Sequence, residues 1–225
     1  MVLKMMRWFL PIFFLISGVL GTWFGGRMLL ADLNAYQVSS FLDDWAERKT
    51  APSDAAWTVA HGAAERAIAF APMADADHYD RLGQVHQWQH LGRFYGDGTA
   101  RASREDALRA YRRAAELRPL WPHAQIRIAQ TKLLMLEFDR EFDQSVRQAL
   151  ALGAGRVSVY ERLVRIGLTA WHELEAPQRE LILTAAQDAV AQRPRLAGPI
   201  LDHAERLRLQ GVVCDVLGPD VARCR

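Results

Sequence analysis

The feature that most constrains the fold of this 225-residue chain is a pattern of large and small side chains between residues 88 and 119. Its first half has the form Trp-x2-Leu-Gly-x2-Tyr, and its second half spaces two alanines around a tyrosine ahead of a proline. The positions are Trp88, Leu91, Gly92, Tyr95, Ala107, Tyr111, Ala114 and Pro119. Small residues let two antiparallel helices approach closely, and the aromatic side chains fill the space around them. The stretch therefore predicts a pair of packed helices.

This spacing matches the signature of tetratricopeptide (TPR) repeats, which stack as helical hairpins. The spacing of the second half recurs in two other places: Ala60, Ala64, Ala67, Pro72 and Ile182, Ala186, Ala189, Pro194. The helix expected over about 75–95 carries the first half twice, starting at Tyr79 and again at Trp88. Which of the two registers packs against the partner helix stays open. No strand pattern of any length appears, so we expect an all-α, TPR-like solenoid of stacked hairpins.

The remaining helices are predicted from caps, breaks and apolar spacing. Ser53 is expected to cap one helix, and Trp121-Pro122 to begin another that ends near Leu136. Further helices are expected over 140–152, 158–172, 177–192 and 199–209.

A membrane anchor is predicted at the N-terminus, where 19 uncharged and mostly apolar residues separate Arg7 from Arg27. As a helix this run would be about 28 Å long, close to the hydrocarbon thickness of a bilayer. A cleaved signal peptide is the alternative, but it would have a shorter apolar run and a small-x-small cleavage site. Lys4 and Arg7 precede the span, which favours a cytoplasmic N-terminus and places the following domain outside the cytoplasm.

Small residues form a stripe on this span at Ser17, Gly21 and Gly25. Such a stripe allows two membrane helices to approach closely, so a homodimer through these residues is one interpretation. The alternative is that the stripe has no specific partner, because glycine is common in membrane helices.

Apolar residues continue at helical spacing beyond the span, at Leu29, Leu30, Leu33, Val38, Phe41, Leu42 and Trp45. The anchor is therefore expected to continue as an amphipathic helix to about Arg48. Its apolar stripe could lie on the bilayer or pack on the next helix. Acidic residues such as Asp32, Asp43 and Asp44 favour packing, because they suit an anionic lipid surface poorly.

The expected organisation has four parts. Residues 1–30 form the cytoplasmic N-terminus and anchor, 31–52 the juxtamembrane helix and linker, 53–210 the repeat domain, and 211–225 the tail.

The charge balance excludes one class of partner. The formal net charge is +2, and three basic residues precede the first acidic one, so the rest of the chain is close to neutral. A near-neutral domain has no general attraction to phosphate backbones, and we expect no nucleic-acid binding.

Residue patterns for catalysis are missing from the sequence. It has no glycine-rich phosphate loop, no GxSxG elbow and no cysteine-nucleophile motif, so we expect a protein that is not an enzyme and takes no cofactor. His86 and His90 have the spacing of two metal ligands, but no HExxH glutamate and no evident third ligand accompany them. No metal site is expected.

Two cysteines, Cys214 and Cys224, occur in the tail. In an oxidising compartment they would close a small loop, which contributes about 2–3 kcal/mol in the chain-entropy model. Two free thiols are the alternative if the domain lies in the cytoplasm.

Partner binding is expected on the concave side of the repeat array, which is lined by residues from the first helix of each hairpin. The predicted residues are Asp77, Asp80, Gln84, Gln87, His123, Ile126 and Gln130. For each of them an ordinary solvated polar face is an equally good interpretation.

Several features together resemble a known family. They are one N-terminal span, a TPR-like array, the sequence Arg-Pro-Leu-Trp-Pro at 118–122, and a Cys-x9-Cys-Arg ending. In these features the chain resembles the VpsP family of polysaccharide biosynthesis proteins over most of residues 50–225. The resemblance implies an inner-membrane accessory protein that holds polymerisation or export components together on the periplasmic face. None of the matching motifs is catalytic.

The sequence thus predicts a periplasmic TPR-like scaffold, anchored in the inner membrane and acting through protein partners in exopolysaccharide biosynthesis. One rival is a periplasmic chaperone or assembly factor for secretion or cytochrome maturation. Another is a glycan-binding protein that stacks sugars on Trp88, Trp121 or Trp171.

Overall fold

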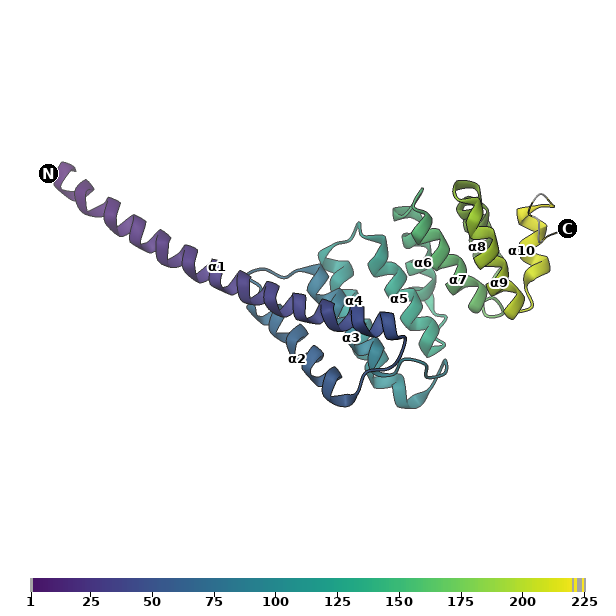
Figure 1. Ribbon diagram of the computed structural model, residues 1–225. Helices are drawn as coiled ribbons and strands as arrows, with labels where there is room; N and C mark the ends of the chain where they lie inside the picture. Colours follow the sequence, from purple (N-terminus) through teal and green to yellow (C-terminus); the bar gives the residue numbers. More distant parts are fainter. Residues whose placement is uncertain (1, 220, 222–223, 225) are drawn as a thin grey trace. The chain divides into compact units, whose positions relative to one another are not determined.

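The computed structural model describes residues 2–219, 221 and 224, with side chains from Phe13 onward. Within these residues the chain forms ten α-helices, two short 3-10 helices and no strand (Figure 1). The expected all-α, helical-repeat fold is confirmed. The helices gather into two compact units, Met1–Leu91 and Gly92–Arg225.

The first unit is built on α1 (Val2–Arg48), one continuous helix that contains both the expected anchor and the expected amphipathic segment. From Phe13 to Leu30 every side chain except that of Arg27 is exposed. The segment Phe13–Arg48 is long and apolar enough to cross a membrane, judged by length and composition. The side chains of Lys4 and Arg7, on which the expected orientation depends, lie outside the described part.

The C-terminal half of α1 packs against α2 (Asp54–Phe70) and α3 (Ala76–Gln89). Its buried stripe repeats every three or four residues and meets alanines of α2, whose small side chains let the two helices approach closely. The buried residues are Ala31, Ala35, Val38, Leu42 and Trp45 on α1, Ala60, Ala63, Ala64 and Ala67 on α2, and Val85 on α3. Because α1 and α2 approach closely, the small alanine side chains are enough to fill the inner face of α2.

The expectation that the whole apolar stripe of 29–45 packs on a neighbouring helix is wrong at its start. Leu29, Leu30 and Leu33 are exposed, whereas Val38 and Trp45 are buried. The physical reason is the helical phase, because the first three residues fall outside the buried 31-35-38-42-45 stripe.

Side-chain hydrogen bonds join the helices of this unit at intervals along α1. The Arg27 guanidinium donates to the carbonyls of Ala69 (2.7 Å) and Phe70 (3.2 Å) at the end of α2. Further along, Arg66 donates to the Asn34 side chain at 2.9 Å. A fourth contact joins α1 to α3, where Arg81 donates to the Ser39 hydroxyl at 3.0 Å.

The start of α2 agrees with the sequence, and the end of α3 does not. The Ser53 hydroxyl accepts from the Ala56 backbone N–H at 3.3 Å, which confirms the predicted cap. Helix α3 was expected to continue to Tyr95 but ends at Gln89, and Gly92 has a left-handed φ of 81°. Gly92 therefore lies in the connection after α3 and is no close-packing position within the helix.

The second unit contains seven α-helices in its described part. They are α4 (Arg101–Leu117), α5 (Pro122–Met135), α6 (Arg140–Leu152), α7 (Val157–Thr169), α8 (Ala176–Gln192), α9 (Ala197–Arg206) and α10 (Gln210–Leu217), with 3-10 turns at Gly98–Ala100 and Pro194–Leu196. The predicted ranges for α5 to α9 agree closely with these bounds. Helix α10 was not predicted, because the tail was expected only to form a small loop closed by its two cysteines.

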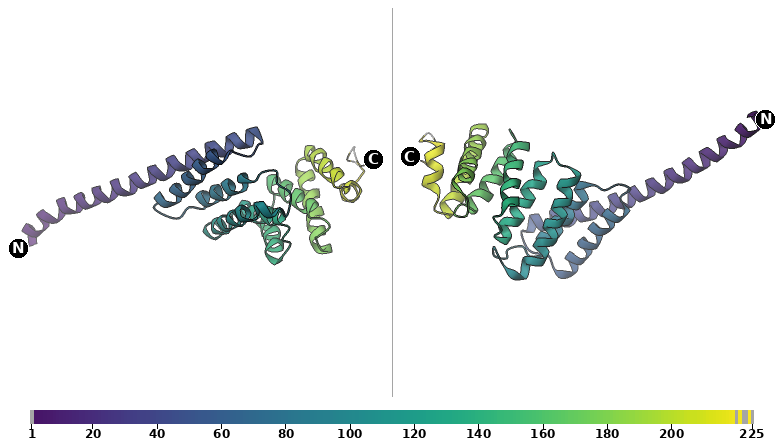
Figure 2. Two further views of the ribbon diagram at one scale, coloured as in Figure 1. Left: turned by 90° about the horizontal axis from the view of Figure 1, so that it is seen from below. Right: turned by 180° about the vertical axis from the view of Figure 1, so that it is seen from behind.

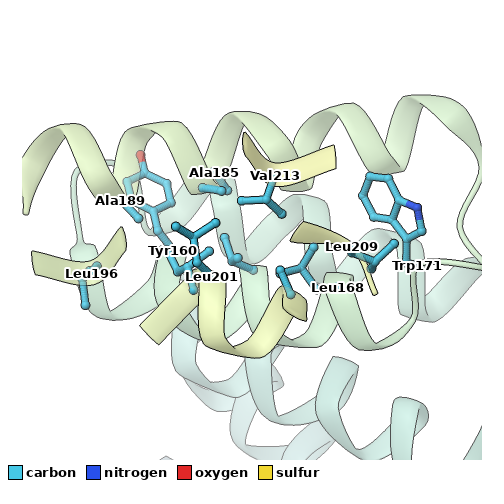
Figure 3. Packing of buried hydrophobic residues seen from close by; sticks show 13 residues of the cluster. Tyr160, Leu168, Trp171, Ala185, Ala189, Leu196, Leu201, Leu209 and Val213 are labelled. Atoms are coloured by element: carbon cyan, nitrogen blue, oxygen red, sulfur yellow. The ribbon is translucent and has the colours of Figure 1, made fainter. Parts of the chain in front are cut away.

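Two clusters of apolar side chains hold α5 to α10 together. One cluster joins α5, α6 and α7 and contains Ile126, Leu133, Phe142, Val146, Ala149 and Leu163. The other joins α7 to α10 (Figure 3) and contains Tyr160, Leu168, Trp171, Ala185, Ala189, Leu201, Leu209 and Val213. Between helices, short residues again face long ones, as the alanine spacing of the sequence predicts.

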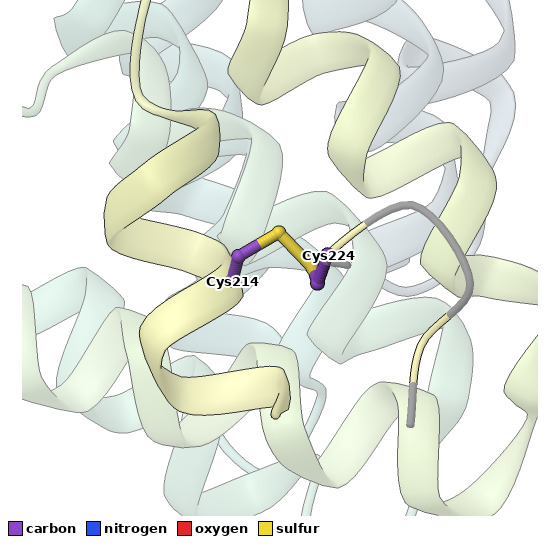
Figure 4. Close-up of a disulfide and its surroundings, with 2 residues drawn as sticks. All are labelled: Cys214 and Cys224. Carbon is purple, nitrogen blue, oxygen red and sulfur yellow. A yellow bond between two sulfur atoms is a disulfide. The ribbon is translucent and has the colours of Figure 1, made fainter. Parts of the chain in front are cut away.

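The end of the second unit is held by a disulfide. Cys214, on α10, and Cys224 are bonded across a Cα–Cα distance of 5.2 Å (Figure 4). The predicted cysteine pair is therefore present. It ties the chain end to α10, which itself packs on α8 and α9 through Val213.

The crossing of α7 and α8 gives a direct test of the packing. A methyl group on Gly167 would overlap three carbons of the Ile182 side chain, which is fully buried. We therefore expect Gly167→Ala to lower the free energy of unfolding by about 1–3 kcal/mol, the usual effect of overpacking. Thermal unfolding of the full chain in detergent, followed by helical circular dichroism, measures the change.

The matched control for this test is Gly198→Ala in α9, where an added methyl group meets no atom within 4 Å. This change should leave stability unchanged or raise it by up to about 1 kcal/mol, because alanine restricts the unfolded chain. Equal melting temperatures for the two variants would contradict the close crossing at Gly167.

Candidate functional site

A groove on the second unit is lined by residues of α6, α7 and α8. It encloses about 390 Å3. Its floor is apolar and its rim is polar. The floor residues are Leu150, Ala151, Tyr160, Leu181 and Ala185, and the rim residues are Arg147, Thr184 and Asp188. A volume of this size accommodates a few side chains of a bound protein segment or a small molecule.

The hollow exists because small and large residues alternate around it. Ala151 and Ala185 leave room that a larger side chain would fill, and the longer Leu150 and Leu181 lie with them in the floor. Tyr160 completes the floor, and the Gly155 backbone N–H donates to its hydroxyl at 3.0 Å.

Arg147 of the groove lining forms an ion pair with Asp143, one turn earlier on α6. Arg147 donates to both carboxylate oxygens of Asp143 at 3.0 Å, and the Gln178 amide donates to the same carboxylate at 3.0 Å. Burial alone would raise the pKa of Asp143, but these hydrogen bonds outweigh it and lower the pKa below its ordinary value of 3.8. The Asp143 carboxylate therefore holds the Arg147 guanidinium in place beside the groove.

The seven residues predicted for the partner-binding face are divided between the two units. In the first unit Asp80 is buried and accepts from the Gln84 amide at 2.7 Å, while Asp77 and Gln87 are half-buried. In the second unit His123 and Gln130 are half-buried.

Ile126 is a correction to that prediction. Its exposed fraction is zero, and it lies in the apolar cluster with Phe142 and Leu163. It cannot contact a partner, because the inner stripe of α5 runs through positions 122, 126, 129 and 133. The prediction placed the outward-facing stripe of this helix one residue away from its position in the structure.

The repeat-packing residues behave differently in the two halves of the pattern. Ala107, Tyr111 and Ala114 on α4 are fully buried, and Pro119 follows the helix end. Leu91 and Tyr95 are 40% and 50% exposed and lie in the connection after α3. The helical copy of the signature is the other register, which was left open: Tyr79, Leu82, Gly83 and His86 all lie within α3.

The connection that follows α3 is held by a buried arginine of α4. Arg104 donates to the carbonyls of Arg93 (3.2 Å), Phe94 (3.0 Å) and Leu134 (2.7 Å). Burial lowers the pKa of this guanidinium from its ordinary value. Arg104 therefore fastens the connection after α3 to α4 and to the end of α5.

The strongest cluster of charges surrounds Lys132 and connects three helices. Its buried ammonium lies 2.7 Å from Asp139, 2.9 Å from Glu141 and 3.5 Å from Glu137. Arg112 of α4 binds both oxygens of Glu141 at 2.7 Å. Each charge has a partner within the protein, so the cluster fastens the α5–α6 turn to α4 and offers no open position for a substrate.

Histidine and tryptophan side chains with functional potential also have structural surroundings. His86 packs edge-on against His61 at 4.9 Å, and among the described residues no three His, Cys, Asp or Glu side chains are grouped to hold a metal ion. Trp88 packs on Trp45, Trp171 is buried beneath Arg179, and Trp121 is half-buried.

Comparisons with known proteins do not name the site. No protein-family model matches the chain, and no curated protein matches it either.

The Lys132 cluster predicts how stability depends on pH. Burial acts against the ammonium, but the hydrogen bonds with Asp139 and Glu141 raise the pKa of Lys132 above 10.5. Ion-pair and backbone hydrogen bonds lower the pKa of Asp139 below 3.8, and those of Arg112 and Lys132 lower that of Glu141 below 4.5. The carboxylates therefore stabilise the fold above these values and lose that contribution as pH falls through their lowered pKa. Lys132 contributes below pH 10.5 and ceases to as pH rises through its raised pKa.

We expect Lys132→Met to lower the free energy of unfolding by about 2–4 kcal/mol near neutral pH, because three carboxylates lose their shared cation. The difference from the unchanged chain should shrink below about pH 4 and above about pH 11. Denaturant unfolding across that range measures it. Arg165→Gln, which removes an exposed pair with Glu161, is the control and should change stability by less than about 1 kcal/mol. A pH-independent loss in the Lys132 variant would contradict the ion-pair account.

Proposed function

We propose that this protein is a single-pass membrane protein whose helical-repeat part holds protein partners on the periplasmic side of a bacterial inner membrane. Its role would be that of a scaffold or accessory protein in exopolysaccharide biosynthesis or export. It acts by position: the anchor confines the repeats to the membrane surface, and the repeats present a fixed binding surface there.

The observation that carries the proposal is the exposure of the N-terminal half of α1. Phe13, Phe14, Leu15, Val19 and Trp23 are each more than 60% exposed on a helix that nothing else in the described chain covers. An apolar helix of this length is stable in a bilayer and costly in water. The packed part of the first unit begins directly after it on the same helix, so α1 joins the anchor to the α1–α2–α3 bundle without a break.

The compartment is supported by two independent features. The bond between Cys214 and Cys224 suits an oxidising environment such as the periplasm. The basic residues ahead of the span favour a cytoplasmic N-terminus, which would put the repeats on the same side as the disulfide chemistry. The polysaccharide assignment rests on the resemblance to the VpsP family.

The groove on α6, α7 and α8 supplies a binding surface for this role. Its apolar floor suits one or two apolar side chains of a partner segment, and Arg147, Thr184 and Asp188 on its rim suit polar groups beside them. No catalytic arrangement accompanies it, which favours recognition over chemistry.

Site-specific crosslinking in the native host tests this function. A photoreactive phenylalanine replaces Thr184, an exposed residue on the groove rim, in the full membrane-anchored chain. We expect it to capture subunits of a polysaccharide polymerase, flippase or export channel. The same amino acid at Gln192, exposed at the far end of α8 and outside the groove lining, is the matched control and should capture far less.

Other outcomes distinguish the rivals. Capture of secretion or haem-maturation subunits at Thr184 would establish an assembly factor and contradict the polysaccharide role. Crosslinks that are equal at Thr184 and Gln192 would contradict the groove as the binding surface. Capture of polysaccharide in place of protein would favour the glycan-binding rival.

A further inference from the structure

The connection between α2 and α3 is apolar and exposed. Eight consecutive residues, Ala67 to Ala74, carry no charge or side-chain hydrogen-bonding group. The first four complete α2, whereas Pro72, Met73 and Ala74 are exposed, and Met73 is 82% exposed. Connections on a water-exposed surface are usually polar, so this segment lacks the composition of an ordinary loop.

This loop lies beside the boundary of the exposed apolar part of α1. The Arg27 guanidinium donates to the carbonyls of Ala69 and Phe70, directly before the loop. Figures 1 and 2 show the loop at the end of α2 and α3 that is nearer the exposed half of α1. Both elements belong to the same compact unit, so their proximity is fixed by packing.

Arg27 sets the level of the membrane surface on this unit. A guanidinium is unstable in hydrocarbon, so a basic residue at the end of an apolar span lies among the lipid headgroups. Trp23 is one turn earlier, 62% exposed, with Arg27 over its ring at 6.0 Å, as expected of an interfacial aromatic residue. Because Arg27 binds the last carbonyls of α2, the end of α2 is at that level as well.

Exposed apolar residues on α1 mark the same zone. Met28, Leu29 and Leu33 follow Arg27 and are 57–60% exposed. From Arg27 to Leu33 the helix rises about 9 Å, and the headgroup zone on each side of a bilayer is about 5–8 Å deep. These α1 residues and Met73 are exposed apolar side chains close in sequence to the two sides of the Arg27 contact, and together they are called the apolar collar.

We propose that the α2–α3 loop is a second membrane contact, in which Met73 and its neighbours insert among the lipid headgroups beside α1. This inference rests on the proposed anchoring of α1. Its occupant is the bilayer itself, because the collar is continuous with the membrane-spanning part of α1 and no other described element of this unit covers it.

The contact has a mechanical consequence. A single helix leaves an attached domain free to tilt about its exit point, whereas a second contact beside it restricts the tilt. The first unit would therefore stand at a defined angle to the bilayer, and its α1–α2–α3 bundle would act as a rigid base.

Depth-dependent fluorescence quenching tests the contact in the full chain. The protein is reconstituted in vesicles of phosphatidylethanolamine and phosphatidylglycerol, with an environment-sensitive nitrobenzoxadiazole probe on one introduced cysteine. The native cysteines are bonded to each other and do not react. The test variant is Met73→Cys, and its matched control is Ala51→Cys, an exposed site in the loop at the other end of the α1–α2 hairpin, about 30 Å away along α1.

We expect the probe at position 73 to have blue-shifted emission and to be quenched most by a nitroxide on the lipid headgroup. The probe at position 51 should be quenched most by iodide in the water. Identical emission and iodide quenching at positions 73 and 51 would overturn the second contact.

A third variant, Leu20→Cys, separates this result from the proposed function. Its probe lies on the exposed face of α1 and should be quenched most by a nitroxide deep in the acyl chains. Deep quenching at position 20 with a water-exposed position 73 would leave the anchor standing and overturn the loop contact. A water-exposed position 20 would overturn the anchor and, with it, the contact that depends on it.

Discussion

The guanidinium of Arg27 lies where the two halves of α1 change their surroundings. Before it the helix is apolar and uncovered, and after it the same helix is one side of a packed bundle. The hydrogen bonds from Arg27 to Ala69 and Phe70 also satisfy carbonyls that the end of α2 leaves without helical partners. A positive charge at this end is further favoured by the dipole of α2. One side chain thus joins α1 to the end of α2 one turn before the buried stripe of α1 begins at Ala31.

Beyond Arg27, the helices of each unit pack by the same arrangement of side chains. Alanines on one helix face long side chains on the next, at Ala60 and Ala64 against α1 and at Ala185 and Ala189 in the last helices. Where the inner residue is glycine, as at Gly167, the approach is closest and the neighbouring Ile182 occupies the vacated space. Ion pairs such as those of Lys132 then fasten the turns between helices, where apolar contact is smallest. The groove on α6 to α8 is a place where this alternation leaves a gap open to solvent.

Much of this fold could be predicted from the sequence because its signals are local. Alanine spacing, Ser53 as a cap and Pro122 at a helix start each depend on a few neighbouring residues, and all three predictions hold. The prediction that the helix continues through the signature at Trp88 was wrong, because spacing alone does not show where a helix ends. Gly92 fits a close-packed helix and a left-handed turn equally well, and its φ of 81° selects the turn. The prediction that Ile126 contacts a partner was wrong for a related reason. On a helix, an error of one residue in the predicted face exchanges a surface side chain for a core side chain.

The groove could not be predicted in the same way, because its residues come from three helices and are chosen by how those helices cross. Leu181 and Leu150 look like ordinary core residues in the sequence, and Ala185 looks like a packing contact. Only their arrangement around Tyr160 makes a hollow. The sequence shows the loop at Met73 as a run of uncharged residues. The proposal that this loop contacts the membrane depends on the hydrogen bonds of Arg27, which only the structure shows. Sites built from distant segments therefore need the structure, whereas most helix ranges and most inner-face residues could be predicted from local sequence patterns.

The central claim is that α1 crosses the membrane and holds the repeats on the periplasmic side. A pair of fusions at the C-terminus tests it most directly, one carrying alkaline phosphatase and one carrying a fluorescent protein that matures only in the cytoplasm. The account predicts an active phosphatase in the membrane fraction and no fluorescence from the second fusion. A fluorescent fusion with inactive phosphatase would place the repeats in the cytoplasm and contradict the account.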